Sequence, residues 1–267
     1  MTVERSKCAG WPVFIALLAL LLSGCSTAPS ADATPSPTVI PTAASQPSGT
    51  PAPSPVQPEQ PLSVSFVAAD GVQRSGRLFV SGENNDIGVV LAHMGAHGAD
   101  QSSWTSFAEL IALQGFGALT FNFRTNRSTL AIDVLAAIEF LRDQGYQHIV
   151  CIGASMGGTA CLKAAMNTDL AGGVVISSLW TTGSGPTGGE LVVSREDLAG
   201  LRLPLLFVST ENDGNGVPDA IKDMYEAAPE PKALKMLPGS AHGTDIFATH
   251  QGDELRDLLL DFLDNLR

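Results

Sequence analysis

The pentapeptide Gly153-Ala154-Ser155-Met156-Gly157 limits the possible folds of this chain more than any other feature of its sequence. An apolar run, 148–152, precedes it, and a helix-forming run, 156–167, follows it. A serine between such runs, with glycine two residues away on either side, is typical of a sharp turn with room only for small neighbours. We therefore expect the Ser155 hydroxyl to stand clear of a sheet, at a helix N-terminus whose partial positive charge favours an oxyanion.

The rest of the chain alternates short apolar runs with amphipathic ones. The pattern predicts strands at 63–68, 74–80, 87–92, 118–123, 149–152, 174–177, 205–209 and 233–237, and helices at 103–114, 130–142, 156–167, 218–227 and 254–266. The turn signal Asp70-Gly71 makes the first two strands an antiparallel hairpin. The later alternation of strand and helix predicts an α/β fold, with a mostly parallel central sheet and helices on both faces.

Three residues suited to nucleophilic catalysis each follow one of the predicted strands. Ser155 follows 149–152, Asp213 follows 205–209, and His242 follows 233–237. The carboxyl ends of parallel strands share one edge of the sheet, which is where such folds bind ligands. A serine hydroxyl needs a base to become nucleophilic, and a carboxylate fixes the tautomer of that base. We therefore predict Ser155, His242 and Asp213 as nucleophile, base and orienting acid.

Each assignment has an alternative. Ser155 could be an ordinary turn serine and His242 a surface-loop histidine. Glu211 is another candidate acid, and Asp219 is a third, although its position also suits a helix cap. We favour Asp213 because Asn212-Asp213-Gly214 supplies a turn that can aim a side chain inward.

These motifs resemble those of α/β-hydrolase fold enzymes over residues 65–267. The resemblance rests on the serine turn, Asn212-Asp213-Gly214, Ala241-His242-Gly243, and His93-Met94-Gly95 after an early strand. The segment 89–104 also resembles the dienelactone-hydrolase-like and small-esterase branch, which often uses cysteine where this chain has Ser155.

The resemblance implies ester hydrolysis without a cofactor, on a small-molecule ester. It implies an oxyanion hole of two backbone N–H groups, one from Met156 and the other from Met94 or Gly95. Many relatives have His-Gly where this chain has His93-Met94. Relatives also often show Asp-x-Arg-Gly where this chain has Asn122-Phe123-Arg124-Thr125. The loop after this segment is also short, so we expect an open rim there.

Histidine and cysteine give no further site in our interpretation. His93 and His97 are four residues apart, but no helix and no third ligand accompany them, so we predict no metal site. His93 is expected to pack and hydrogen-bond within its loop. We interpret Cys151 and Cys161 as two buried free thiols. A disulfide between them is the alternative outside the cytoplasm.

The N-terminus has the layout of an export signal. Residues 1–24 combine a positive start with a short apolar core. The ending Leu22-Ser23-Gly24-Cys25 resembles a bacterial lipoprotein signal, which implies cleavage before Cys25 and lipidation of that cysteine. The alternative is an ordinary signal peptide. Residues 25–61 are rich in Pro, Ser, Thr and Ala, which predicts a disordered tether. The resemblance thus implies a domain anchored to the bacterial cell membrane, outside the cytoplasm.

Residues 62–267 have the length of one catalytic domain, which we expect to be a monomer. The chain carries a formal charge of −12, which argues against nucleic acid as a partner. The stretch 179–200, here called the flap, is rich in Gly and Thr. It cannot build a folded helical cap, so we expect a flexible flap and no substantial cap domain. An open site of this kind suits small or medium acyl esters better than long-chain lipids.

The sequence therefore predicts a lipid-anchored serine carboxylesterase that works through an acyl-enzyme. Two alternatives remain. One is a non-catalytic binding or scaffolding lipoprotein on a hydrolase fold, because a fold does not fix a function. The other is a serine peptidase, although such enzymes usually carry an added specificity domain.

Overall fold

The computed structural model describes residues 60–80, 86–95, 98–183 and 189–267, which belong to one compact unit. The predicted signal segment, Cys25, all but the end of the predicted tether and His97 lie outside the described residues. Within the described ranges, no helix is long and apolar enough to cross a membrane.

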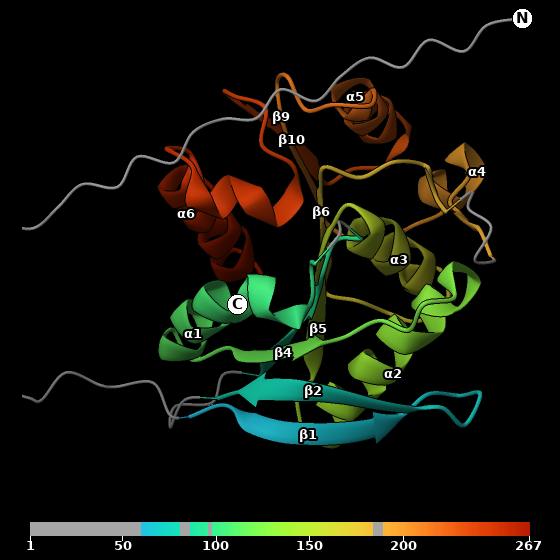
Figure 1. The fold of residues 1–267 in the computed structure, drawn as a ribbon, viewed down its shortest axis with the longest axis vertical. Coiled ribbons are helices and arrows are strands. Elements are labelled where there is room, and N and C mark those ends of the chain that lie inside the picture. The colour runs from blue at the N-terminus through green and yellow to red at the C-terminus, as the bar shows by residue number, and fades with distance from the viewer. Residues whose placement is uncertain (1–59, 81–85, 96–97, 184–188) are drawn as a thin grey trace, which may run out of the picture. The chain divides into compact units, whose positions relative to one another are not determined.

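An eight-stranded sheet occupies the centre (Figure 1). Its strands, in spatial order, are β1 (Leu62–Val67), β2 (Gln73–Phe79), β4 (Gly117–Phe121), β3 (Ile87–Ala92), β5 (His148–Ala154), β6 (Gly172–Ile176), β9 (Leu205–Thr210) and β10 (Lys232–Leu237). β2 is antiparallel to both of its neighbours, and every other pairing in this sheet is parallel. Every residue of β3, β4, β6 and β9 is buried, as expected for strands covered on both faces. The predicted fold class is confirmed.

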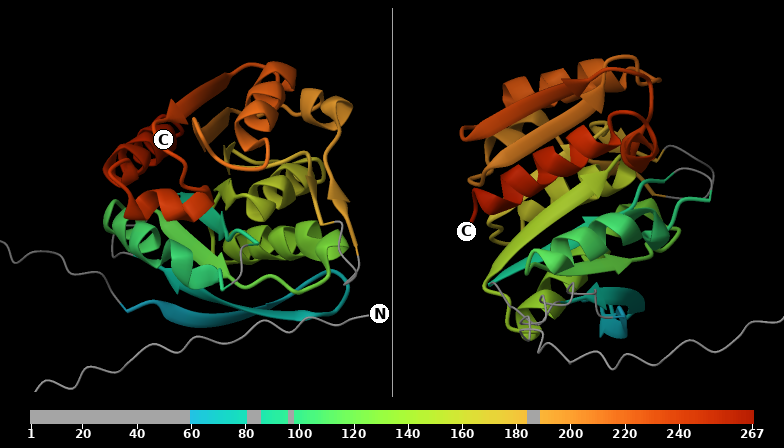
Figure 2. Two further views of the ribbon diagram at one scale, coloured as in Figure 1. Left: turned by 45° about the horizontal axis from the view of Figure 1, so that its top comes forward. Right: turned by 90° about the vertical axis from the view of Figure 1, so that its left-hand side faces the viewer.

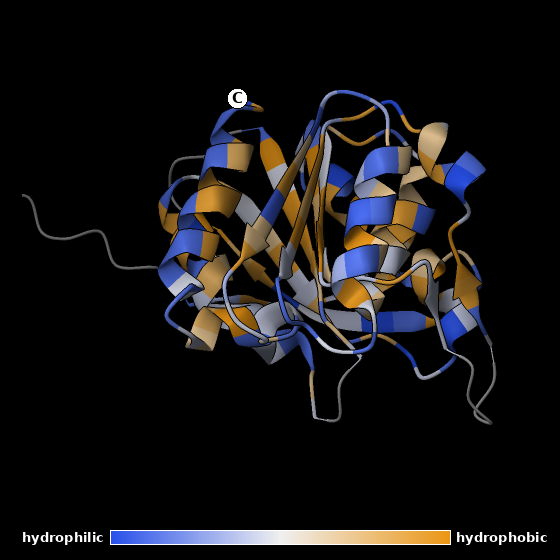
Figure 3. Cartoon of the chain, turned by 90° about the horizontal axis from the view of Figure 1, so that it is seen from above, coloured by the Kyte–Doolittle hydropathy of each residue, from blue (hydrophilic) through white to orange (hydrophobic). Residues whose placement is uncertain are grey.

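Helices cover both faces of this sheet (Figures 1 and 2). One face is covered by α1 (Thr105–Leu113) and α6 (Gly252–Asp264), and the other by α2 (Leu130–Asp143), α3 (Met156–Ala165) and α5 (Val217–Ala227). In α6, the buried Leu255, Leu259 and Leu263 recur every four residues and form the apolar stripe that meets the sheet. Figure 3 shows hydrophobic residues along the central strands, whereas the helices combine hydrophobic and hydrophilic residues.

Three short 3-10 helices lie in loops at the carboxyl ends of strands. They are η1 (Gln101–Trp104), η2 (Arg127–Thr129) and η3 (Gly243–Ala248). η1 follows β3, η2 follows β4 and η3 follows β10, so all three lie at the edge of the sheet where we predicted the site.

The flap contains more structure than the sequence analysis predicted. β7 (Thr181–Thr182) pairs with β8 (Leu191–Val192), and the short helix α4 (Arg195–Ala199) follows. Ser194 caps this helix through the Asp197 amide, and the Asp197 carboxylate accepts from the Ser194 amide. Residues 184–188 lie outside the described part of the chain. One hairpin and one short helix do not form a cap domain, so that part of the prediction holds.

The prediction that Cys151 and Cys161 are free thiols is wrong. The two cysteines form a disulfide, with 5.8 Å between their Cα atoms. Cys151 lies in β5 and Cys161 in α3, and the tight turn between these elements brings the two side chains face to face. Their Cα separation falls in the range that a disulfide spans without backbone movement. The bridge therefore closes a loop that contains Ser155.

Candidate active site

Ser155 lies at the apex of the sharp turn between β5 and α3. Its backbone has φ 50° and ψ −116°, a conformation that residues other than glycine rarely adopt. A Cβ on Gly157 would overlap the carbonyl oxygen of Ala92, and one on Gly153 would overlap the backbone of Gly157. Both glycines are thus required by close backbone packing, and the structure shows the predicted turn.

The neighbouring strand supports this turn from one side. The Ser155 amide donates to the carbonyl of Ile176 at 2.7 Å, and the Ser178 hydroxyl donates to the Ser155 carbonyl at 2.8 Å. The Thr159 hydroxyl, one turn into α3, donates to the carbonyl of Leu179 at 2.8 Å. These bonds tie the serine turn to the end of β6 and the start of the flap.

Asp213 and His242 meet at the carboxyl ends of β9 and β10. Nδ1 of His242 lies 2.9 Å from Oδ1 and 3.0 Å from Oδ2 of Asp213. The Asp213 side chain is 3% exposed and that of His242 is 33% exposed, so the carboxylate is covered while the imidazole reaches the surface.

The two loops that carry this pair are joined along their backbones. The Glu211 amide donates to the Leu237 carbonyl at 2.8 Å, and the Asn212 amide donates to the Gly239 carbonyl at 2.9 Å. The Thr210 hydroxyl adds a bond to the carbonyl of Ala241 at 2.9 Å. The loop after β9, which carries Asp213, and the loop after β10, which carries His242, are therefore held in a fixed position relative to each other.

The other two candidate acids point elsewhere. Glu211 is exposed, and Asp219 is exposed near the start of α5, where it pairs loosely with Lys222 at 4.0 Å. Of the three carboxylates considered from the sequence, Asp213 is the one that contacts His242.

The serine and histidine loops lie against each other. A Cβ on Gly243 would lie 3.4 Å from the Cβ of Ala154, so the residue after His242 borders the residue before Ser155. Within the described residues, the Ser155 hydroxyl makes no hydrogen bond to His242. The structure thus joins His242 to Asp213 directly and packs the residue after His242 against the residue before Ser155.

The residues expected to form an oxyanion hole lie together. Met156 is the first residue of α3, a position whose amide has no acceptor within the helix. A Cβ on Gly95 would lie 3.0 Å from Sδ and 3.3 Å from Cβ of Met156, which brings the two candidate donor segments side by side. Met94 is buried, with its sulfur against Gly243.

A family model described as the alpha/beta hydrolase family matches residues 89–264, well over half of the chain. The chain belongs to the alpha/beta hydrolase family. No curated protein matches it significantly in sequence.

Solved structures with the same fold include several esterases. The esterase domain of a Rhodothermus marinus protein is 20% identical, with a TM-score of 0.60 over 74% of this chain and 97% of that one. A dienelactone hydrolase from Anabaena variabilis is 19% identical, with a TM-score of 0.63 over 78% and 98%. A Xanthomonas campestris protein described as an α/β serine hydrolase without lid is 16% identical, with a TM-score of 0.60 over 79% and 97%. At these identities the likeness shows the fold.

His93 connects the loop after β3, which contains Met94 and Gly95, to the loop after β4. Its Nδ1 lies 2.7 Å from the Met94 carbonyl, and the Phe123 amide donates to its Nε2 at 3.1 Å. A nitrogen that accepts from an amide carries no proton, so the ring is neutral and Nδ1–H donates to Met94. Burial lowers the pKa of His93, which agrees with the neutral ring. The expected packing role of His93 is confirmed.

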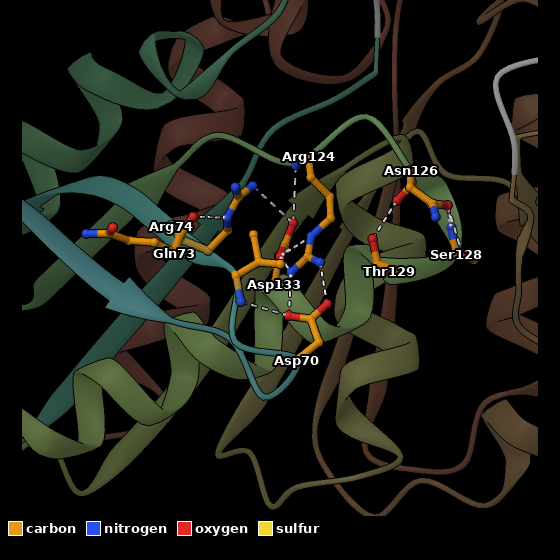
Figure 4. Close-up of polar contacts among 9 residues, drawn as sticks. Asp70, Gln73, Arg74, Arg124, Asn126, Ser128, Thr129 and Asp133 are labelled. Carbon is orange, nitrogen blue, oxygen red and sulfur yellow. Dashed lines mark hydrogen bonds and ion pairs between the residues drawn. The ribbon is translucent and has the colours of Figure 1, made fainter.

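Asp133 is a buried acidic residue for which the sequence predicted no role. Its carboxylate accepts from the Arg124 amide at 3.2 Å and from Arg124 Nε at 2.8 Å, and Arg124 also pairs with Asp70 (Figure 4). These partners raise the pKa of Arg124. The bonds fix the loop after β4, whose Phe123 amide reaches His93. The sequence pattern does not distinguish Asp133, because it is one of several charged residues on an amphipathic helix and has no distinctive spacing.

Across the described ranges, no group of three or more His, Cys, Asp and Glu side chains is arranged to hold a metal ion. Both ring nitrogens of His93 are already hydrogen-bonded to backbone groups. His97, the other histidine considered for a metal pair, lies outside the described residues.

Proposed function

We propose that this α/β hydrolase is a serine carboxylesterase that acts on small or medium acyl esters through an acyl-enzyme. The observation that carries the proposal is the Asp213–His242 pair beside a serine held at φ 50°. Strain of this kind persists where surrounding contacts enforce it, and it concentrates at functional sites.

In the proposed reaction, the Ser155 oxygen attacks the ester carbonyl and its proton passes to Nε2 of His242. Asp213 holds the proton of Nδ1 and stabilises the imidazolium. The carbonyl oxygen becomes an oxyanion that accepts hydrogen bonds from the Met156 amide and from the Met94–Gly95 loop. When the C–O bond breaks, His242 returns the proton to the alcohol. A water molecule then attacks the acyl-enzyme with His242 as the base. The proton returns to the Ser155 oxygen as the acid is released.

The size of the substrate is inferred from the flap. One short hairpin and the five-residue helix α4 cannot enclose a long acyl chain. The alcohol part of the ester is not limited in size in the same way, because it can extend out of the site into solvent. We therefore propose small or medium acyl groups, and the similar fold described as lacking a lid agrees with this choice.

We also propose that the enzyme works outside the cytoplasm, anchored through lipidated Cys25. The support is the sequence Leu22-Ser23-Gly24-Cys25 together with the apolar segment before it. Two or more acyl chains on one cysteine would give stable membrane attachment. Expression with a labelled fatty acid tests this directly: the native chain should incorporate label and sediment with membranes, and Cys25→Ser should do neither.

A fluorophosphonate probe, which labels activated serines, tests the catalytic assignment. Full-length protein should be labelled, and Ser155→Ala and His242→Ala should abolish the labelling. Matched controls are Ser63→Ala and His250→Ala, which remove an exposed serine and an exposed histidine elsewhere. Hydrolysis of nitrophenyl acetate and butyrate should follow the same pattern.

Two results would overturn the proposal. Absence of labelling and of hydrolysis by well-folded native protein would favour a binding protein on a hydrolase fold. Labelling accompanied by cleavage of peptide amides in preference to esters would instead identify a serine peptidase.

A further inference from the structure

Arg127 carries a positive charge that has no role in the reaction steps proposed above. It lies on η2, is half-buried, and donates from one terminal nitrogen to the Thr182 hydroxyl at 2.9 Å. Among the described residues, no carboxylate lies within ion-pair distance of it. A guanidinium has five N–H donors, and its bond to Thr182 is the one that it makes to the part of the chain that the structure describes.

The backbone and the side-chain stem of Arg127 are both held in place. The Asn126 side chain accepts from the Ser128 amide at 3.1 Å, and the Thr129 hydroxyl donates to the Asn126 carbonyl at 2.8 Å (Figure 4). These bonds fix the backbone of η2, which contains Arg127. From the flap, the bare Cα of Gly183 packs against the stem so closely that a Cβ there would overlap Arg127 Cδ. The guanidinium is therefore positioned before any substrate binds.

The charge lies next to the proposed oxyanion hole. A Cβ on Gly95 would lie 3.4 Å from a terminal nitrogen of Arg127 and 3.0 Å from Sδ of Met156. The guanidinium thus borders Gly95, in one of the two segments whose amides are proposed to bind the oxyanion, and Met156 of the other segment lies against the same glycine.

We propose that Arg127 stabilises the oxyanion that forms on the substrate carbonyl, as a cationic supplement to the two backbone amides. A fixed charge in a partly water-excluded site acts strongly on charge that develops within a few ångströms. The chain carries a formal charge of −12, which repels anionic substrates at long range. We therefore assign to Arg127 the negative charge that develops on the carbonyl oxygen during the reaction, and not an anionic group of the substrate. The inference rests on the proposed esterase function.

Kinetics of full-length Arg127→Gln and Arg127→Lys test this assignment on a matched pair of esters. Nitrophenyl butyrate is neutral, and the nitrophenyl monoester of succinate places a carboxylate near the end of a similar acyl chain. The control is Arg202→Gln, which makes the same change of charge at an exposed position just before β9, at the opposite end of the sheet. Melting temperatures of all variants establish that they are folded.

The expected result is a roughly 10- to 100-fold lower kcat for Arg127→Gln on both esters, with KM nearly unchanged. Arg127→Lys should recover part of the loss, and Arg202→Gln should match the native protein. A structural role alone would not produce a kcat loss at constant KM and constant melting temperature.

Three outcomes would overturn the inference. If Arg127→Gln keeps native kcat on nitrophenyl butyrate, Arg127 plays no part in stabilising the oxyanion. If it raises KM for the succinate monoester alone, Arg127 binds an anionic group of the substrate. If the native protein hydrolyses neither ester and is not labelled by the fluorophosphonate, the proposed function itself fails, and this inference fails with it.

Discussion

Nδ1 of His242 lies within hydrogen-bond distance of both carboxylate oxygens of Asp213, at 2.9 and 3.0 Å, although the residues are 29 positions apart. A carboxylate can only accept, so the proton between the two groups resides on Nδ1. A neutral imidazole with its proton on Nδ1 leaves Nε2 free to accept a proton. This contact therefore sets the histidine in the tautomer that a general base requires.

Asp213→Asn should lower kcat on nitrophenyl butyrate by about 10²- to 10⁴-fold, because the amide can hold His242 in the wrong tautomer. KM and the melting temperature should change little, since asparagine has nearly the same shape. Steady-state kinetics check this, with Glu211→Gln as the matched control because it neutralises an exposed carboxylate two residues away. A comparable loss in Glu211→Gln, with Asp213→Asn active, would contradict the assignment.

Gly157→Ala should destabilise the protein by about 1–3 kcal/mol, the usual cost of overpacking a filled interior. The new methyl group would overlap the Ala92 carbonyl at the end of β3, and backbone cannot rotate away as a side chain can. Urea unfolding measures the change. Gly214→Ala is the control, because a Cβ there meets nothing within 4 Å. Equal stability of the two variants would show that the turn is looser than described.

The sequence was sufficient to predict features set by local pattern. Apolar runs identified the strands of the central sheet, and the glycines around Ser155 predicted the turn. Asp213 was distinguished from Glu211 by its turn context, and the contact with His242 agrees with that choice. The predictions of the strands and of the turn were confirmed because each depends on residues close together in the chain, whereas the catalytic role of Asp213 stays a prediction.

Other features were not predicted, either because they depend on how loops and elements meet in the fold or because a local signal was outweighed by its neighbours. Arg127 and Gly95 are 32 positions apart, and only the folded sheet brings their loops together. The disulfide depends on how the turn aligns β5 with α3, which two cysteines in a sequence cannot reveal. The Ser194–Asp197 capping box indicates the start of helix α4. The glycine-rich run before it led us to predict a flexible segment instead.

Loss of the Cys151–Cys161 bridge should lower the free energy of unfolding by about 2–3 kcal/mol, the effect expected for closure of a short loop. Urea unfolding of the native protein with and without a dithiol reductant measures this, and Cys151→Ala/Cys161→Ala provides the permanently open loop. Thiol counting in denaturant should find two more thiols after reduction. An unchanged count would mean that the cysteines are free, and reductant should then leave stability unaltered.

The burial of His93 and its two hydrogen bonds to backbone groups predict that the stability of the protein depends on pH. Burial lowers the pKa of His93 in the folded protein below its ordinary value of 6.5. As the pH falls below 6.5, the unfolded chain binds a proton at this residue before the folded protein does. Stability should therefore fall with decreasing pH until the folded-state pKa is reached, by at most about 1.4 kcal/mol per pH unit.

Urea unfolding at pH 8, 7, 6 and 5 of the native protein and of His93→Gln isolates this contribution. The glutamine does not titrate, while the remaining histidines are common to both proteins and cancel in the difference. The native protein should lose more stability than the variant between pH 7 and 5, and the two should run parallel above pH 7. Parallel curves over the whole range would mean that His93 takes up its proton as readily in the folded protein as in the unfolded chain. The Phe123 amide could not then be donating to Nε2 as the structure shows.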